Sequence, residues 1–178
     1  MPKISAFIAT SLDGFIARPD GALDWLPTEK DEDGGDFGHQ EFLASVDTIV
    51  MGRHTFEKIL SFGIDWPFDD KRVVVLSSRP AALPEALAGK VAWQSGDPHS
   101  VVARLAAEGA RHIYVDGGFT IQAFLRARLI QHLTLTQVPV LLGRGIALFG
   151  PVAHDLPLTH VRTVAYSNGL VQSEYALE

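Results

Sequence analysis

Short hydrophobic runs recur along the chain, separated by segments rich in glycine, proline and polar residues. The first run, 3–10 (KISAFIAT), is apolar on both alternating faces, which is typical of a central strand covered on both sides. Within a longer run at 132–141, Pro139 would mark an edge or a bulge, because proline removes a ladder donor. Further strands are predicted at 47–51, 72–76, 91–93, 113–115, 160–166 and 170–176.

Helical periodicity lies between the strands, and residues 11–27 are predicted as a long loop. Asp97 is an N-cap candidate, and Gly109 stands just past the end of the same helix. The last two strands are joined through 167–169 (SNG), and Asn-Gly between alternating runs favours a hairpin. The alternation predicts an α/β fold with a mostly parallel sheet and an antiparallel edge. Helices are predicted at 36–45, 54–60, 98–108 and 120–127.

Two of the buried strands run into glycine and then into a helix. The first junction is 48–57 (TIVMGRHTFE), and the second is 112–124 (HIYVDGGFTIQAF). A helix N-terminus presents unpaired N–H groups, and glycine lets a phosphate approach the backbone closely. A third strand ends in 77–79 (SSR). The carboxyl ends of such strands converge on one crevice, so the sequence predicts a nucleotide site there.

Polar side chains at these strand ends suit a phosphate. Arg53 could pair with it through a planar guanidinium, and Thr55 could donate a hydroxyl. The structural alternatives are a solvated charge for Arg53 and a helical residue bonding its own backbone for Thr55. Ser77 and Ser78 are equally compatible with a plain turn. Arginine together with hydroxyls suits a phosphate monoester, which favours NADPH over NADH.

Composition narrows the functional class. The chain has 178 residues, 47% of them hydrophobic, which predicts one domain over 1–178. Its net charge of -6 and the absence of a Lys/Arg block argue against nucleic acid and favour a small-molecule substrate. The absence of cysteine excludes disulfides and thiolate nucleophiles, and the seven histidines are scattered, so no metal site is predicted. No signal or membrane segment is recognised, which predicts a soluble cytoplasmic protein without a membrane partner.

Six segments, in the same order and across nearly the whole chain, resemble the dihydrofolate-reductase-like superfamily: ATSLDGFIARPDG, DWL, VMGRHTFE, LSSRP, VDGGFT and PVLLGRG. Within it, the chain is most similar to stand-alone relatives of the reductase domain of the bacterial bifunctional riboflavin-biosynthesis deaminase-reductase. MGRHTFE also resembles the cofactor-binding segment of dihydrofolate reductases. The resemblance implies a dihydrofolate-reductase-like fold and an NADPH-dependent reductase.

The resemblance also implies four groups of cofactor contacts, one for each part of NADPH. They are Gly52, Arg53, His54 and Thr55 at the adenosine phosphates; Ser77, Ser78 and Arg79 at the adenine end and 2'-phosphate; Gly117, Gly118, Phe119, Thr120 and Ile121 at the pyrophosphate; and Ala9, Thr10 and Ile16 at the nicotinamide.

Hydride transfer to a C=N or C=O carbon also needs a proton source. By resemblance to dihydrofolate reductases the acid is Asp36, and Thr136 is the hydroxyl that would hydrogen-bond it. Asp36 has an ordinary alternative as a helix N-cap, and Glu41 is an alternative acid. Asp13 either lies beside the substrate or stabilises the S-L-D-G turn. Trp25 either covers the pocket or packs on the core.

The leading prediction is an NADPH-dependent reductase acting on a heterocyclic or ribosyl substrate, first of all 5-amino-6-(5-phosphoribosylamino)uracil. The alternatives are a dihydrofolate reductase and a non-catalytic NADPH-binding homodimer. A homodimer is implied by the resemblance, with residues 138–142 as either its seam or interior core. Candidate partners for the substrate phosphate are Arg18, Lys58, Arg144 and Arg162.

Overall fold

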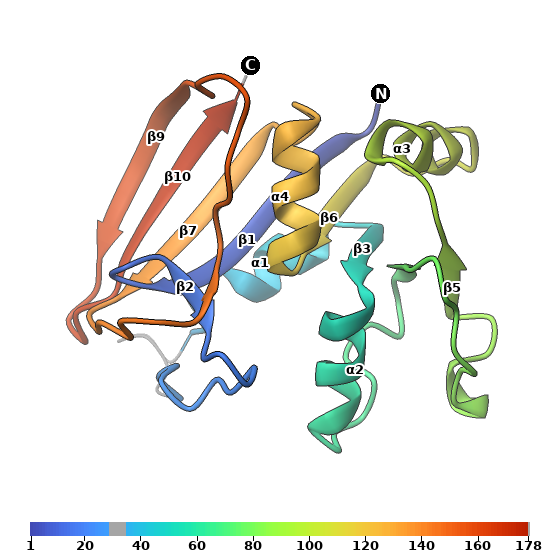
Figure 1. Ribbon diagram of the computed structural model, residues 1–178, viewed down its shortest axis with the longest axis horizontal. Coiled ribbons are helices and arrows are strands. Elements are labelled where there is room, and N and C mark those ends of the chain that lie inside the picture. The colour runs from blue at the N-terminus through green and yellow to red at the C-terminus, as the bar shows by residue number, and fades with distance from the viewer. Residues whose placement is uncertain (29–34, 178) are drawn as a thin grey trace.

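The computed structural model describes residues 1–28 and 35–177, and one eight-stranded sheet organises them (Figure 1). The strands are β1 Lys3–Ser11, β3 Thr48–Gly52, β4 Arg72–Leu76, β5 Val91–Gln94, β6 His112–Asp116, β7 His132–Val138, β9 Leu158–Ala165 and β10 Val171–Leu177. Their order is β5-β4-β3-β6-β1-β7-β10-β9. Neighbours from β5 to β7 are parallel, whereas β10 is antiparallel to both β7 and β9. The predicted parallel sheet with a C-terminal antiparallel hairpin is confirmed.

Helices cover both faces of this sheet (Figure 1). They are α1 His39–Ser45, α2 Arg53–Ser61, α3 Pro98–Ala107 and α4 Gly118–Arg126. Successive strand residues alternate between two cores: Val50 and Val74 pack with α3 and α4, whereas Ile49 and Val73 pack with α1 and α2. The central strands are therefore apolar on both faces because each face is covered by helices.

Local signals explain where two of the helices begin. The Asp97 carboxylate accepts a hydrogen bond from the backbone N–H of Ser100 at 3.1 Å, so the predicted N-cap of α3 is confirmed. The helix predicted from residue 36 begins instead at His39. Phe37 and Gly38 have φ angles of 58° and 81°, a left-handed conformation that a helix cannot include.

Three details of the strand and loop predictions are corrected. The predicted loop at 11–27 contains the short strand β2, Phe15–Ala17, which pairs with β8, Ile146–Ala147. β7 ends at Val138, immediately before Pro139, and is an interior strand rather than an edge. A 3₁₀ turn at Glu85–Leu87 was not predicted.

In the described part of the chain the longest helix, α3, has 10 residues, and no helix there is long and apolar enough to cross a bilayer.

Candidate functional site

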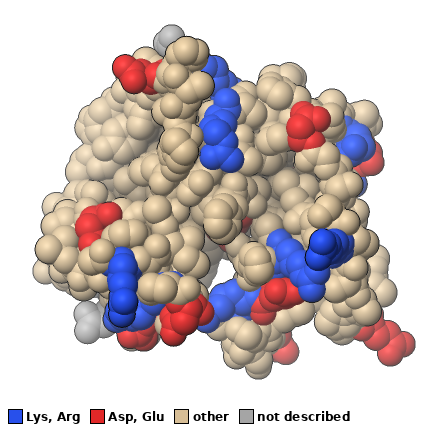
Figure 2. All heavy atoms as spheres, in the orientation of Figure 1, with Lys and Arg blue, Asp and Glu red and all other residues tan. Residues whose placement is uncertain are grey.

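A large cleft of about 1440 Å³ lies at the carboxyl ends of the central strands. Figure 2 shows the molecule hollowed between the region of β2 and α2, with acidic and basic side chains at the rim. Its walls come from β1, the segment after β2, residues 35–39, α2, the β6–α4 junction and β7. The predicted site residues that line it are Ala9, Ile16, Asp36, Gly52, Arg53, His54, Thr55, Gly117, Gly118, Phe119, Thr120 and Thr136.

The two glycine junctions lie side by side in the wall of this cleft, at the ends of the neighbouring strands β3 and β6. A Cβ on Gly117 would collide with Thr55 Oγ1, and one on Gly52 would stand 3.0 Å from Thr120 Oγ1. Gly117 also has a φ of 91°, which side chains rarely adopt. The caps of α2 and α4 are Gly52 and Gly117, which have no side chain to bond the first helical N–H groups. Two helix N-termini with open donors and two threonines therefore converge, an arrangement suited to a diphosphate.

Arg53 connects this region to the end of β4. Its Nε donates to Glu57 Oε1 at 2.6 Å, and its Nη1 donates to the Arg79 carbonyl at 3.1 Å. The Arg79 N–H in turn donates to Ser77 Oγ at 3.0 Å, so Ser77 closes a turn, and Ser78 is exposed beside it. An exposed i,i+4 ion pair contributes only about 0.3–0.5 kcal/mol, so Arg53 can exchange Glu57 for a phosphate at little cost.

An acid that the sequence reasoning missed lies in the floor of the cleft. Asp116 ends β6, and burial raises the pKa of its carboxyl despite the opposing hydrogen bond that Gly117 N–H donates to Oδ1 at 2.8 Å. The Tyr114 hydroxyl donates to the Phe7 carbonyl at 3.1 Å, and its proximity to Asp116 also opposes the rise in the pKa of Asp116. The signal that the sequence offers for it is an acidic residue at the carboxyl end of a buried strand.

A second group of polar side chains lines the cleft from α1 and β7. Asp36 Oδ2 accepts a hydrogen bond from Gln40 N–H at 2.8 Å, so Asp36 serves the first turn of α1 while facing the cleft. His39, also unanticipated, lines the cleft on the next turn, and burial lowers its pKa despite nearby Asp36. Thr136 Oγ1 accepts a hydrogen bond from Gln172 at 2.9 Å. The described residues show no hydrogen bond between Asp36 and Thr136, although both face the cleft.

Asp13 joins two loops outside the cleft lining. Its carboxylate accepts hydrogen bonds from the Ser11 hydroxyl at 2.6 Å and from the N–H groups of Leu142 and Gly143 at 3.1 and 2.7 Å. These bonds, that from Ser11 foremost, lower the pKa of Asp13. The structure thus places Asp13 in the turn-stabilising arrangement.

The remaining predicted residues also lie off the cleft surface. Thr10 and Ile121 are fully buried behind it. Trp25 is half-buried in the segment after β2, and Glu41 is exposed on α1. Ser77, Ser78 and Arg79 stand just beyond the cleft lining, which reaches Leu76.

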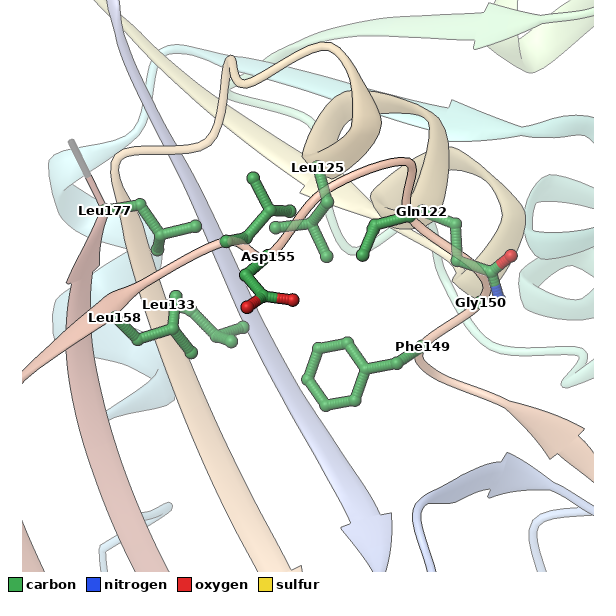
Figure 3. Close-up of a pocket in the computed structure, with 10 residues that line it drawn as sticks. Gln122, Leu125, Leu133, Phe149, Gly150, Asp155, Leu158 and Leu177 are labelled. Atoms are coloured by element: carbon green, nitrogen blue, oxygen red, sulfur yellow. The ribbon is translucent and has the colours of Figure 1, made fainter.

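A smaller, apolar pocket of about 440 Å³ opens on the α4 face (Figure 3). Leu125, Leu133 and Leu177 line it from α4, β7 and β10, beneath the segment 149–158. Among the described residues of its wall, Asp155 is the one that is ionisable. The groups suited to dinucleotide chemistry are instead gathered in the large cleft.

The sheet order and the cleft define the chain as a dihydrofolate-reductase-like protein, as predicted. Dihydrofolate reductase from Enterococcus faecalis, solved as a complex with NADP(H), shares the fold with a TM-score of 0.67 and 19% identity, over 99% of this chain and 96% of that chain. Within that fold, the chain belongs to the RibD C-terminal domain family, which matches residues 2–172.

Two similar proteins span nearly the same length. YwjB of Bacillus subtilis (strain 168), which is uncharacterized, is 32% identical over 157 residues, covering 88% of this chain and 87% of YwjB. A protein of Shewanella sp. PV-4, provisionally assigned to riboflavin biosynthesis, has a solved structure with a TM-score of 0.92 and 38% identity over 99% of both chains. The resemblance to stand-alone relatives of the riboflavin reductase domain is confirmed.

Proposed function

We propose that the protein is an NADPH-dependent oxidoreductase that transfers hydride to a C=N or C=O carbon of a heterocyclic or ribosyl substrate. The observation that carries the proposal is the pair of adjacent helix N-termini, each led by a glycine whose Cβ would meet a threonine of the other junction. Membership of the RibD C-terminal domain family supports it. When bound, NADPH would supply the hydride from its nicotinamide ring.

The residues of the cleft would hold the parts of this cofactor as follows. The N-termini of α2 and α4, with Thr55 and Thr120, would take the pyrophosphate through N–H and hydroxyl donors. Arg53, tied to the turn at Arg79, would take the 2'-phosphate. Ala9 and the β2 segment would face the nicotinamide.

Two carboxyl groups would interact with the substrate in different ways. Asp116 has a raised pKa, so it retains a proton to a higher pH than an ordinary aspartic acid and is suited to protonate the atom next to the reduced carbon. Asp36 would accept a hydrogen bond from an N–H of the substrate, leaving the acid role predicted for it to Asp116. This division is open to test by substituting each residue.

Of the cations expected to meet a substrate phosphate, Lys58 is the one that the structure places in the cleft wall. Arg18 is bound to Asp24 by two hydrogen bonds of 2.6 and 3.0 Å, and Arg162 is paired with Glu174. A phosphorylated substrate would therefore depend on Lys58. The 5-amino-6-(5-phosphoribosylamino)uracil reaction is the first candidate, and dihydrofolate reduction the second.

Binding of NADPH and NADH, measured by titration calorimetry, tests the cofactor assignment. Arg53→Ala is expected to weaken NADPH by about tenfold or more and NADH by less, because a charge-assisted contact to the 2'-phosphate is lost. Arg104→Ala is a matched control, since this exposed arginine also donates to a backbone carbonyl, that of Ser95, at 2.7 Å. Equal losses for both cofactors would remove Arg53 from the 2'-phosphate site, and no binding of either would refute the proposal.

Oxidation of NADPH with each of the two candidate substrates tests the reaction. Asp116→Asn is expected to lower kcat by about a hundredfold or more while leaving NADPH affinity nearly unchanged, because only proton transfer is removed. Asp36→Asn should raise KM instead. Binding without turnover of either substrate would favour the alternative of a non-catalytic NADPH-binding protein.

We also propose that the chain forms a homodimer, through a surface other than residues 138–142. Val138 is buried, whereas Leu141 is exposed, so these residues do not form one face. β9 is an edge strand exposed along its whole length, and Phe149 and Leu158 expose apolar surface beside the smaller pocket. An open edge can pair with the same edge of a second copy. Sedimentation should show a dimer that Val161→Pro, within β9, converts to monomer; a monomeric wild type would refute it.

A further inference from the structure

Gln172 is a buried polar residue on β10, and its side chain hydrogen-bonds two residues that line the cleft. Its side chain is 6% exposed, and its position on β10 pairs with Thr136 on β7. Its Nε2 donates two hydrogen bonds, one to Thr136 Oγ1 at 2.9 Å and one to the Phe37 carbonyl at 3.0 Å. Both hydrogens of the amide are thereby used, and both bonds run to elements that line the cleft.

The first bond fixes the polarity of the Thr136 hydroxyl. A hydroxyl that accepts from an amide must direct its own hydrogen elsewhere, so Thr136 retains a donor that Gln172 does not use. Thr136 is 6% exposed and lines the cleft. An unmet donor at a nearly buried position is costly, so a partner in the cleft is favoured.

The second bond fixes the turn that presents Asp36. Phe37 has a left-handed φ of 58°, a strained conformation for a bulky residue. Gln172 holds the carbonyl of this strained residue, directly after Asp36. Asp36, which lines the cleft, meanwhile keeps one carboxylate oxygen on Gln40 N–H, so the other oxygen is available as an acceptor.

We propose that Gln172 is a positioning residue that sets Thr136 as a hydrogen-bond donor and Asp36 as an acceptor at the substrate end of the cleft. The ligand edge bound there then carries one acceptor and one donor, as an amide-like or amidine-like edge of a heterocycle does. This inference rests on the proposed reductase function for its kinetic consequence, but the hydrogen-bond arrangement stands without it.

The kinetic test uses whichever of dihydrofolate and 5-amino-6-(5-phosphoribosylamino)uracil the wild type reduces. Gln172→Leu and Thr136→Val are each expected to raise KM about tenfold or more with kcat less affected, because an interaction made in both ground and transition states is lost. The double variant should be no worse than Gln172→Leu alone, since Gln172 acts through Thr136 and through the turn at Phe37, and only the first of these is removed by Thr136→Val. Gln172→Glu keeps the length but reverses the polarity, and should fail as the leucine variant does.

Ser173→Ala is the matched control for β10. Its hydroxyl hydrogen-bonds Thr163 on the neighbouring strand at 2.8 Å, so the substitution removes a sheet contact without touching the cleft. KM should remain at the wild-type value. The proposal would be overturned if the Gln172 variants had the same KM as this control. It would also be overturned if the effects of Gln172→Leu and Thr136→Val on KM were fully additive.

A magnetic resonance measurement tests the hydrogen bonds of Gln172 even if no substrate is turned over. The side-chain amide hydrogens of Gln172 should exchange much more slowly than those of exposed Gln40, and Thr136→Val should shift them. Gln172→Leu should shift the backbone resonances of Asp36 and Phe37 while NADPH affinity stays near that of the wild type. Exchange as fast as at Gln40 would refute the arrangement, whereas failure of NADPH binding alone would refute only the cofactor assignment.

Discussion

Replacing Gly117 by alanine is expected to damage stability and cofactor binding together, for two separable reasons. The residue has a φ of 91° and a ψ of 139°, a conformation that side chains rarely adopt and that costs about 1–3 kcal/mol. The new Cβ would also overlap Thr55 Oγ1, and overpacking of this kind adds about 1–3 kcal/mol. The free energy of unfolding should therefore fall by about 2–6 kcal/mol.

Gly109 offers a control that has a positive φ but no steric overlap. Its φ is 92°, and a Cβ there would meet nothing within 4 Å. Gly109→Ala should lower the free energy of unfolding by a backbone cost alone, about 1–2 kcal/mol. Adding Thr55→Ala to Gly117→Ala removes the overlapping oxygen. The double variant should therefore recover the stability lost to steric overlap, although not the stability lost to backbone strain.

Urea unfolding and NADPH calorimetry measure these effects in parallel. Gly117→Ala should lose NADPH affinity, because the N–H groups at the start of α4 move away from the pyrophosphate, whereas Gly109→Ala should bind normally. The reasoning fails if the two alanine variants are equally stable, or if Thr55→Ala leaves the Gly117 defect unchanged.

Two further predictions concern pH, and both are checked by urea unfolding across a pH series. Burial raises the pKa of Asp116 above the ordinary 3.8, so the folded state loses stability as the pH rises through that raised pKa. Asp116→Asn should be more stable than the wild type at neutral pH, and the difference should disappear below pH 3.8; parallel curves would contradict this. Burial lowers the pKa of His112, whose ring contacts Ser5 Oγ at 2.9 Å and the Ser45 carbonyl at 2.9 Å. The folded state should then lose stability as the pH falls below 6.5, and His112→Gln should flatten that decline; an unchanged slope would assign it to other groups.

The fold was predictable because its signals are local. Runs such as β4 are apolar on both faces and end at a serine-proline turn, and the Asn-Gly pair marks the final hairpin. The short β2 was not predictable, since its three residues pair only with two residues more than a hundred positions later in the chain. α1 begins at His39, later than predicted, because Phe37 has a left-handed φ. The carbonyl of Phe37 is held by a distant partner, Gln172, which local sequence does not reveal.

The candidate site was predictable in part. The glycine junctions stand at strand ends, and the parallel topology brings them together without further information. Asp116 and Gln172 were missed for different reasons. The first is an acid whose burial depends on packing around Tyr114, and the second is a glutamine whose partners lie on β7 and before α1.

The central position of β1 has a consequence for how the chain folds. Lys3 pairs with His112 and Phe7 with Thr134, so the first strand made has both its neighbours more than a hundred residues later. Until those segments are available, β1 exposes two apolar faces and two unpaired edges. Folding dominated by such distant pairings is slow, and the unfinished chain is exposed to association with others. Co-expression of a chaperone or a lower growth temperature should therefore raise the yield of folded protein more than surface substitutions do.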